Sequence, residues 1–356
     1  MIFYSYTDTD VTFSLHDSVF AINAGVPVYL CGSFTEWNHR PDERYRLEPV
    51  TGKPGMRCIV LPRSVLDVPG NSGHPEFKFQ SFDPDGSCRE YSAPADSSIP
   101  RFLDNFVLLY DNDDPEELKI YADRAEYIAG LKDFNPSKRE SLHNLANFRR
   151  VPGSTLLYRS YHPYKKSFPH LETEDLRSAT VKQLLKDASI QSIICLSGRE
   201  APDSSLGEEI SVWHSAIIAR GDVLFIDTSY ESAYYHTAEP VFLDVFAHIL
   251  QFICDHAGPY LVHCRLGSDR TGVVSALLAA LCGASWAEIA ADYERTAQMA
   301  IREVRSSRLL AWAFTSLLGG TMMPDRRFDK ELYALLVQRG IASEETLKAV
   351  ITRLTA

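Results

Sequence analysis

The stretch Leu261-Val-His-Cys-Arg-Leu-Gly-Ser-Asp-Arg-Thr-Gly272 is the most informative segment of this chain of 356 residues. The apolar run over 259–262 predicts a buried strand that stops at His263 and Cys264. Small and apolar residues from 271 to 281 predict a buried helix that ends near Gly283. Residues 265–270 are therefore predicted to form a loop between a strand and the N-terminus of a helix.

This loop has the composition of an anion site, and we call residues 264–270 the cradle. Successive backbone N–H groups in such a loop can point inward, and the helix N-terminus adds positive potential. Gly267 supplies the freedom that a tight turn needs, and Arg270 offers two parallel donors to phosphate oxygens. The sequence therefore predicts a phosphate site made by Arg270 and the backbone of Arg265, Leu266, Gly267 and Ser268.

Cys264 is the predicted nucleophile of this site. The positive potential that binds phosphate also favours the thiolate, which is the form that attacks. The Thr271 hydroxyl can donate to the sulfur and improve it as a leaving group, while His263 is expected to orient the loop. The alternative is a buried structural cysteine near a surface arginine, but the surrounding His, Gly and Thr-Gly weigh against a chance pair.

The pattern of apolar residues changes at two points along the chain. Residues 1–112 contain short alternating runs (11–15, 26–30, 57–61 and 76–80), which predict an all-β sandwich domain. Residues 113–140 are predicted to form a connecting helical linker, with helical spacing over 115–131. Strands then alternate with helices over 141–356, which predicts an α/β domain that is helical after the cradle.

The composition of the chain restricts its expected partners and compartment. A net charge of −11 argues against nucleic-acid or anionic-membrane partners. Seven cysteines without a paired framework suit a reducing compartment. We see no signal peptide and no apolar run long enough to span a bilayer, so the expected location is cytoplasmic. No cofactor is expected, and no cluster of metal ligands is evident.

Residues 145–356 resemble the bacterial protein tyrosine/serine phosphatases, whose cradle reads His-Cys-x-Ala-Gly-Lys-Asp-Arg-Thr-Gly. Further similarity lies in residues 147–149, 157–160, 189–196 and 288–296. The resemblance implies a central, mainly parallel sheet flanked by helices, and hydrolysis of phosphotyrosine, phosphoserine or related esters through a cysteinyl-phosphate. Ser268 stands where the family usually has Lys, and this loss of charge weakens the case for multiply phosphorylated lipids as substrates.

Two aspartates compete for the role of general acid. Asp269 lies inside the cradle, and the resemblance favours it because the corresponding Asp is thought to act in relatives. Asp227 ends a predicted strand, about where other cysteine phosphatases place a mobile acid loop, but it could equally be a turn or cap residue. Arg159 is expected either to line the phosphate pocket or to be a buried structural arginine.

The N-terminal region has a resemblance of its own. Residues 28–38 and 76–80 are similar to glycogen-binding modules of AMP-activated kinase beta subunits and starch-branching enzymes. The resemblance implies that Trp37 and Lys78 could contact a glucan. The alternative is a sandwich that binds no sugar and serves packing or dimerisation, with Trp37 in its core.

Three classes of function follow. The first is an active cysteine-dependent phosphatase whose partner is a phosphorylated protein or small molecule. The second is a glucan-directed phosphatase that the N-terminal domain delivers to phosphorylated polysaccharide. The third is a pseudophosphatase that binds phosphorylated partners without turnover. The intact Cys264, Arg270 and Thr271 favour the first class.

Overall fold

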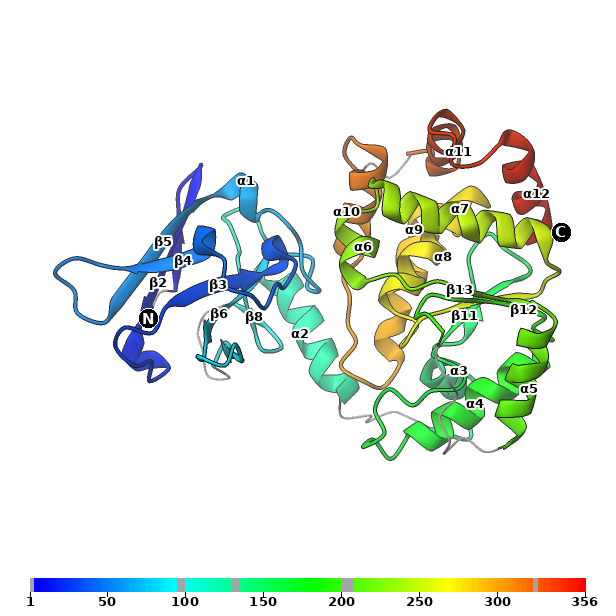
Figure 1. Ribbon diagram of the computed structural model, residues 1–356, viewed down its shortest axis with the longest axis horizontal. Coiled ribbons are helices and arrows are strands. Elements are labelled where there is room, and N and C mark those ends of the chain that lie inside the picture. Colours follow the sequence, from blue (N-terminus) through cyan, green and yellow to red (C-terminus); the bar gives the residue numbers. More distant parts are fainter. Residues whose placement is uncertain (1–2, 95–99, 130–134, 200–207, 323–325) are drawn as a thin grey trace. The chain divides into compact units, whose positions relative to one another are not determined.

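The computed structural model describes residues 3–94, 100–129, 135–199, 208–322 and 326–356 (Figure 1). The chain divides into two compact units, Met1–Glu126 and Tyr127–Ala356.

The first unit is an all-β domain, as predicted. Its strands form one antiparallel sheet of nine strands in the order β1-β2-β5-β4-β3-β6-β9-β8, with β7 paired to β6. The strands are β1 (Tyr4–Tyr6), β2 (Asp10–His16), β3 (Val28–Gly32), β4 (Arg46–Pro49), β5 (Met56–Pro62), β6 (Glu76–Phe82), β7 (Cys88–Tyr91), β8 (Arg101–Phe102) and β9 (Asn105–Val107). The short helix α1 (Arg63–Leu66) follows β5.

This sheet curls over to enclose its own core. The rings of Phe13 on β2 and Phe77 on β6 lie 5.0 Å apart between centroids, although three strands separate β2 from β6 in the sheet. Both side chains are fully buried, as are Phe79 and Phe106. β4 pairs with both β3 and β5, so the two layers expected of a sandwich are parts of one continuous sheet.

Helix α2 (Pro115–Ala129) begins where the helical spacing of residues 115–131 predicted. The predicted linker extended to residue 140, and residues 130–134 lie outside the described part. Helix α3 (Arg139–Leu145) then leads into the first strand of the second unit.

The second unit is built on a five-stranded sheet in the order β10-β11-β14-β12-β13. The pairs β11–β14, β14–β12 and β12–β13 are parallel, and β10–β11 is antiparallel. The strands are β10 (Arg149–Arg150), β11 (Leu157–Ser160), β12 (Ser192–Cys195), β13 (Val223–Phe225) and β14 (Tyr260–His263). β14 therefore has a parallel neighbour on each side.

Helices cover both faces of this sheet (Figure 1). Tyr260 and Val262 of β14 belong to the larger core with α7 (Pro240–Asp255) and α8 (Asp269–Leu281). Leu261 belongs to a smaller core with α4 (Glu174–Asp187) and α5 (Glu208–Ala219). The helices are α4 (Glu174–Asp187), α5 (Glu208–Ala219), α6 (Tyr230–Tyr235), α7 (Pro240–Asp255), α8 (Asp269–Leu281), α9 (Trp286–Arg295), α10 (Ser307–Leu318), α11 (Phe328–Gln338) and α12 (Glu344–Thr355).

The C-terminal helices complete the larger core. Leu309, Leu310 and Phe314 of α10 are fully buried in it, so this apolar cluster is core packing. Ser285 and Glu288 form a reciprocal cap at the start of α9. Among the described residues, no helix combines the length and apolar character that crossing a bilayer requires.

Candidate active site

The cradle has the predicted strand–loop–helix geometry. β14 ends at His263, Cys264 follows it, and α8 begins at Asp269. Cys264 is 3% exposed. Gly267 has φ +76°, and a Cβ at this position would lie 2.2 Å from the carbonyl oxygen of Ser160. Only glycine therefore fits this turn without moving backbone.

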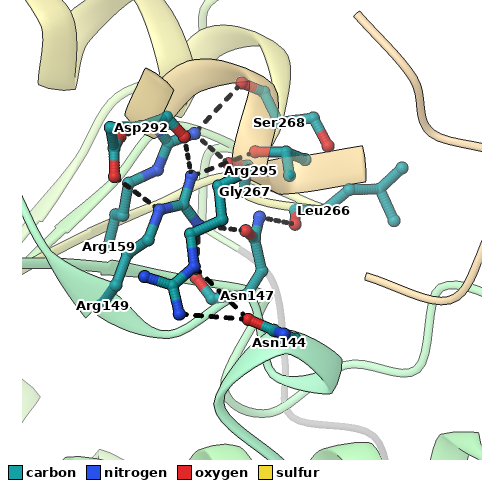
Figure 2. Close-up of polar contacts among 10 residues, drawn as sticks. Asn144, Asn147, Arg149, Arg159, Leu266, Gly267, Ser268, Asp292 and Arg295 are labelled. Carbon is teal, nitrogen blue, oxygen red and sulfur yellow. Dashed lines mark hydrogen bonds and ion pairs between the residues drawn. The ribbon is translucent and has the colours of Figure 1, made fainter. Parts of the chain in front are cut away.

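The carbonyl groups of the cradle are anchored from outside the loop (Figure 2). Asn147 Nδ2 donates to the Leu266 carbonyl at 3.1 Å, and Arg159 Nη2 donates to the Gly267 carbonyl at 2.6 Å and to that of Ser268 at 3.4 Å. The C=O and N–H of a trans peptide unit point in opposite directions. These anchors therefore turn the N–H groups of residues 267–269 away from Asn147 and Arg159, which favours the inward orientation that an anion site needs.

A buried ion network holds the anchoring residues in place. Asp292 Oδ2 accepts from Arg159 Nη1 at 2.8 Å, and its Oδ1 accepts from Arg149 Nε at 2.5 Å. Arg149 also donates to the side chain of Asn147. We call Asn147, Arg149, Arg159 and Asp292 the anchor network; Figure 2 shows it beside Leu266, Gly267 and Ser268 of the cradle.

Burial changes the acid–base properties of this network. Burial lowers the pKa of Arg149 to about 10; Asp292 opposes this shift, and the neighbouring positive charge of Arg159 adds to it. Burial raises the pKa of Asp292, but Arg149 and Arg159 lower it by more, so it lies below its usual value. Arg149 and Asp292 are therefore both charged at neutral pH. Arg159 is only 1% exposed and donates to the carbonyl groups of Gly267 and Ser268.

Arg270 is tied to the ends of two other strands. Its Nη1 donates to the carbonyl oxygens of Leu196 and Thr228, both at 3.0 Å, just beyond β12 and β13. The hydroxyls of Ser197, Thr228 and Thr271 are buried and have no hydrogen-bond partner within the described part of the chain. Buried polar groups of this kind usually bind a ligand or water. Thr271 follows Arg270 in the chain, and Ser197 and Thr228 are next to or identical with the residues whose carbonyl groups Arg270 binds. Donation from Thr271 to the Cys264 sulfur stays a prediction.

The remaining cradle residues face different surroundings. Arg265 is exposed, donates to the Ser167 carbonyl at 2.9 Å and lies over the Phe168 ring. Its side chain is thus engaged outside the loop. Ser268 is 1% exposed, and fully buried His263 contacts the Cys264 carbonyl through Nδ1 at 3.1 Å.

The two candidate acids occupy different environments. Asp269 is largely buried, and its Oδ1 accepts from Arg305 Nε at 2.8 Å and from the Tyr234 hydroxyl at 3.1 Å. Asp227 is exposed, and its backbone forms an isolated β-bridge with Ser197. The next residue, Thr228, is the one whose carbonyl oxygen accepts from Arg270. Asp269 is thus part of the cradle itself, and Asp227 precedes the residue whose carbonyl group Arg270 binds.

Sequence reasoning missed the residues that hold Asp269. Arg305 also pairs with Glu303 at 2.7 Å; burial lowers the pKa of Arg305, but Asp269 and Glu303 raise it well above its usual value. The hydroxyls of Tyr234 and Tyr293 lie 2.5 Å apart, and burial raises the pKa of each. Tyr234 and Arg305 lie 35 and 36 residues from Asp269, and no local pattern signals these contacts.

The fold also assembles three potential metal ligands that the sequence did not reveal. The ligand atoms of His162, Cys195 and His263 all lie within 4.8 Å of one another, and all three residues are buried.

In the first unit, Trp37 is half-buried and has φ 56°, whereas Lys78 pairs with Glu90 at 3.1 Å. Glu36 and Asn38, on either side of Trp37, line a cavity of about 350 Å³. Its other lining residues are mainly polar and include Thr35, Arg40, Asp42, Arg44 and Gln80.

One comparison with known proteins, the match to a family model, agrees with the chemistry of the cradle. Residues 203–353 match the model of the tyrosine phosphatase family. No curated protein matches the chain. Two solved structures of the Siw14 catalytic core, one titled a PP-IP phosphatase from S. cerevisiae in complex with citrate, are 18% identical and have a TM-score of 0.30. Each match covers 55% of this chain and 94% of the other, and a likeness this distant carries no argument about substrate.

The match over residues 203–353 includes Cys264, Arg270 and α8. The chain is a protein-tyrosine-phosphatase-like phosphoric monoester hydrolase of the cysteine-dependent type.

Proposed function

We propose that this chain hydrolyses phosphotyrosine, phosphoserine or related phosphomonoesters through a cysteinyl-phosphate intermediate at Cys264. The observation that carries the proposal is the anchored cradle. Asn147 and Arg159 hold its carbonyl groups from outside, and Cys264 stands at its start beside the N-terminus of α8.

The first step transfers the phosphoryl group to the enzyme. The Cys264 thiolate attacks phosphorus, the bond from phosphorus to the leaving oxygen breaks, and Asp269 donates a proton to that oxygen. Backbone N–H groups of residues 265–270 and the Arg270 guanidinium bind the equatorial oxygens, where negative charge spreads in the transition state.

The second step regenerates the enzyme. Water attacks phosphorus, the S–P bond breaks, and the Asp269 carboxylate takes a proton from the water. Inorganic phosphate leaves and Cys264 returns to the thiolate. Neither step uses a metal ion, so turnover in excess EDTA is expected.

The experiment is a leaving-group series in excess EDTA. Aryl phosphates with good and poor leaving groups are hydrolysed by the wild type, by Asp269→Asn and by Asp227→Asn. We expect the wild type to turn over all of them and Asp269→Asn to lose at least about 10²-fold in kcat, since a general acid typically contributes about 10²- to 10⁴-fold. The loss should increase as the leaving oxygen becomes more basic, because that oxygen then depends more on the donated proton.

Asp227→Asn serves as the matched variant. If the loss in kcat of Asp227→Asn increases with the basicity of the leaving oxygen and the loss of Asp269→Asn does not, Asp227 is the general acid. Arg305 keeps Glu303 as a partner in Asp269→Asn, so no buried cation is left unpaired. Binding of aryl phosphate without turnover by the wild type at any pH from acidic to neutral would instead identify a pseudophosphatase.

The second candidate is a glucan-directed phosphatase, which the polar cavity beside Trp37 favours. A half-buried tryptophan can stack on a sugar ring while polar neighbours bind hydroxyls. The test is co-sedimentation of the full chain with glycogen, beside Trp37→Ala and, as a control, Trp312→Phe in α10. Binding that Trp37→Ala weakens by at least about tenfold supports the candidate, and absence of wild-type sedimentation removes it.

A further inference from the structure

Three buried side chains with metal-binding atoms lie close together at the carboxyl ends of β11, β12 and β14. His162 and Cys195 are each 1% exposed and His263 is fully buried. One ligand atom from each lies within 4.8 Å of the other two. We call these residues the His–Cys–His cluster; the proposed reaction assigns no chemical step to it.

Strand register explains why residues so far apart in sequence meet. In the β12–β14 pair, Cys195 is the direct partner of His263. In the β11–β14 pair, Ser160 is the partner of His263, and His162 follows Ser160 by two residues. The cluster thus lies at the carboxyl ends of β11, β14 and β12, the three central strands of the sheet.

The cluster is separate from the nucleophile. Side chains alternate between the faces of a strand. Leu261 and Ile193 belong to the smaller core with α4 and α5, so His263 and Cys195, two residues further on, lie towards that face. Cys264 packs in the larger core on the opposite face.

The ligand chemistry fits a zinc-like ion. Two imidazoles and a thiolate are ligands that zinc and its neighbours prefer. Bond lengths of about 2.0–2.1 Å to nitrogen and 2.3 Å to sulfur place tetrahedral ligand atoms about 3.3–3.6 Å apart. The present spread of up to 4.8 Å therefore needs each side chain to move inward by about 1 Å or less.

One imidazole already has the orientation of a ligand. The Cys264 carbonyl can only accept, so His263 Nδ1 carries the proton in their 3.1 Å contact. Its Nε2 then has the lone pair that a metal needs. Donation of the second ring N–H to a backbone carbonyl is the usual support of a metal-binding histidine.

We propose that His162, Cys195 and His263 bind one transition-metal ion of the zinc class, with a fourth ligand from solvent. The ion links β11, β12 and β14 at the edge from which the cradle starts, and therefore stabilises the cradle from the opposite face to the nucleophile.

The test uses cobalt as a spectroscopic substitute for zinc in the full chain. Protein purified from cobalt-supplemented cells is analysed for metal content and for the sulfur-to-cobalt charge-transfer absorption. The variants are Cys195→Ser, His162→Gln and Cys264→Ser, with Cys254→Ser of α7 as the matched control. Thermal unfolding with and without added zinc is measured on the same proteins.

We expect one ion per chain, with a charge-transfer band in the wild type, Cys264→Ser and Cys254→Ser and none in Cys195→Ser. His162→Gln should keep the band but bind more than about 100-fold more weakly, since losing only a supporting partner costs about 10- to 100-fold. Zinc should raise the unfolding temperature of the wild type and not that of Cys195→Ser.

Two results would overturn the proposal. A band that vanishes in Cys264→Ser and survives in Cys195→Ser would place the metal on the nucleophile. A wild type without cobalt absorption and without a zinc-dependent thermal shift would show that the cluster is held by hydrogen bonds alone. Both readouts are independent of turnover, so an inactive protein could still bind the metal.

Discussion

Cys264→Ser is expected to lower turnover of an aryl phosphate by at least about 10⁴-fold, the scale on which enzymes lose activity when their nucleophile is removed. A serine hydroxyl stays protonated under conditions where a cysteine in a phosphate-binding loop attacks as thiolate. The substitution leaves Arg270 and the cradle backbone intact, so substrate binding should survive. The measurement is kcat with binding of the same aryl phosphate, determined by calorimetry on the variant.

Cys282→Ser is the matched control for this variant. Cys282 follows the last residue of α8, and burial raises the pKa of its thiol to about 12, so it is protonated at neutral pH. Its replacement should leave turnover unchanged. Equal activity of Cys264→Ser and the wild type would disprove the cysteinyl-phosphate mechanism.

Asp292→Asn is expected to lower the free energy of unfolding of the second unit by about 3–5 kcal/mol, the usual cost of removing one partner of a buried ion pair. The carboxylate is 11% exposed and binds the almost fully buried Arg149 and Arg159. Asparagine would leave these guanidinium groups without a counter-charge. The measurement is urea unfolding followed by tryptophan fluorescence, since Trp213, Trp286 and Trp312 all lie in this unit.

Asp329→Asn provides the control, because Asp329 pairs with Arg327, whose side chain is 63% exposed. An exposed pair contributes about 0–1 kcal/mol, so this variant should unfold nearly like the wild type. Equal destabilisation by the two substitutions would mean that the anchor network contributes no more than a surface pair.

The pH dependence of the Asp292 effect follows from its lowered pKa. A group whose folded-state pKa is lowered stabilises fully above its unfolded-state pKa, about 3.9 for Asp, and loses this contribution as the pH falls through the folded-state value. The stability difference between the wild type and Asp292→Asn should therefore be constant near neutral pH and narrow below about pH 4.

Local patterns predicted the parts of the chain that local forces determine. The apolar run over 259–262 and the small residues after Thr271 correspond to β14 and α8. The alternation in residues 1–112 corresponds to β2, β3, β5 and β6. Each of these signals lies within one element, where periodicity and turn chemistry suffice.

The supports of the cradle could not be predicted in the same way. Asn147 binds Leu266 across 119 residues, and Arg149 binds Asp292 across 143. Such pairs depend on the order of strands in the sheet, which short-range spacing does not encode. The same holds for His162 and Cys195, which strand register brings to His263.

The position of β14 in the sheet has a practical consequence for dissecting this enzyme. The region that matches the tyrosine phosphatase family model begins at residue 203. Both strands that pair with β14 lie before it, β11 at Leu157–Ser160 and β12 at Ser192–Cys195. A truncated protein starting at 203 would retain Cys264 and Arg270 but leave β14 with two bare edges, a known source of aggregation. The smallest autonomous phosphatase fragment should therefore begin before α3, well upstream of the segment that sequence matching would select.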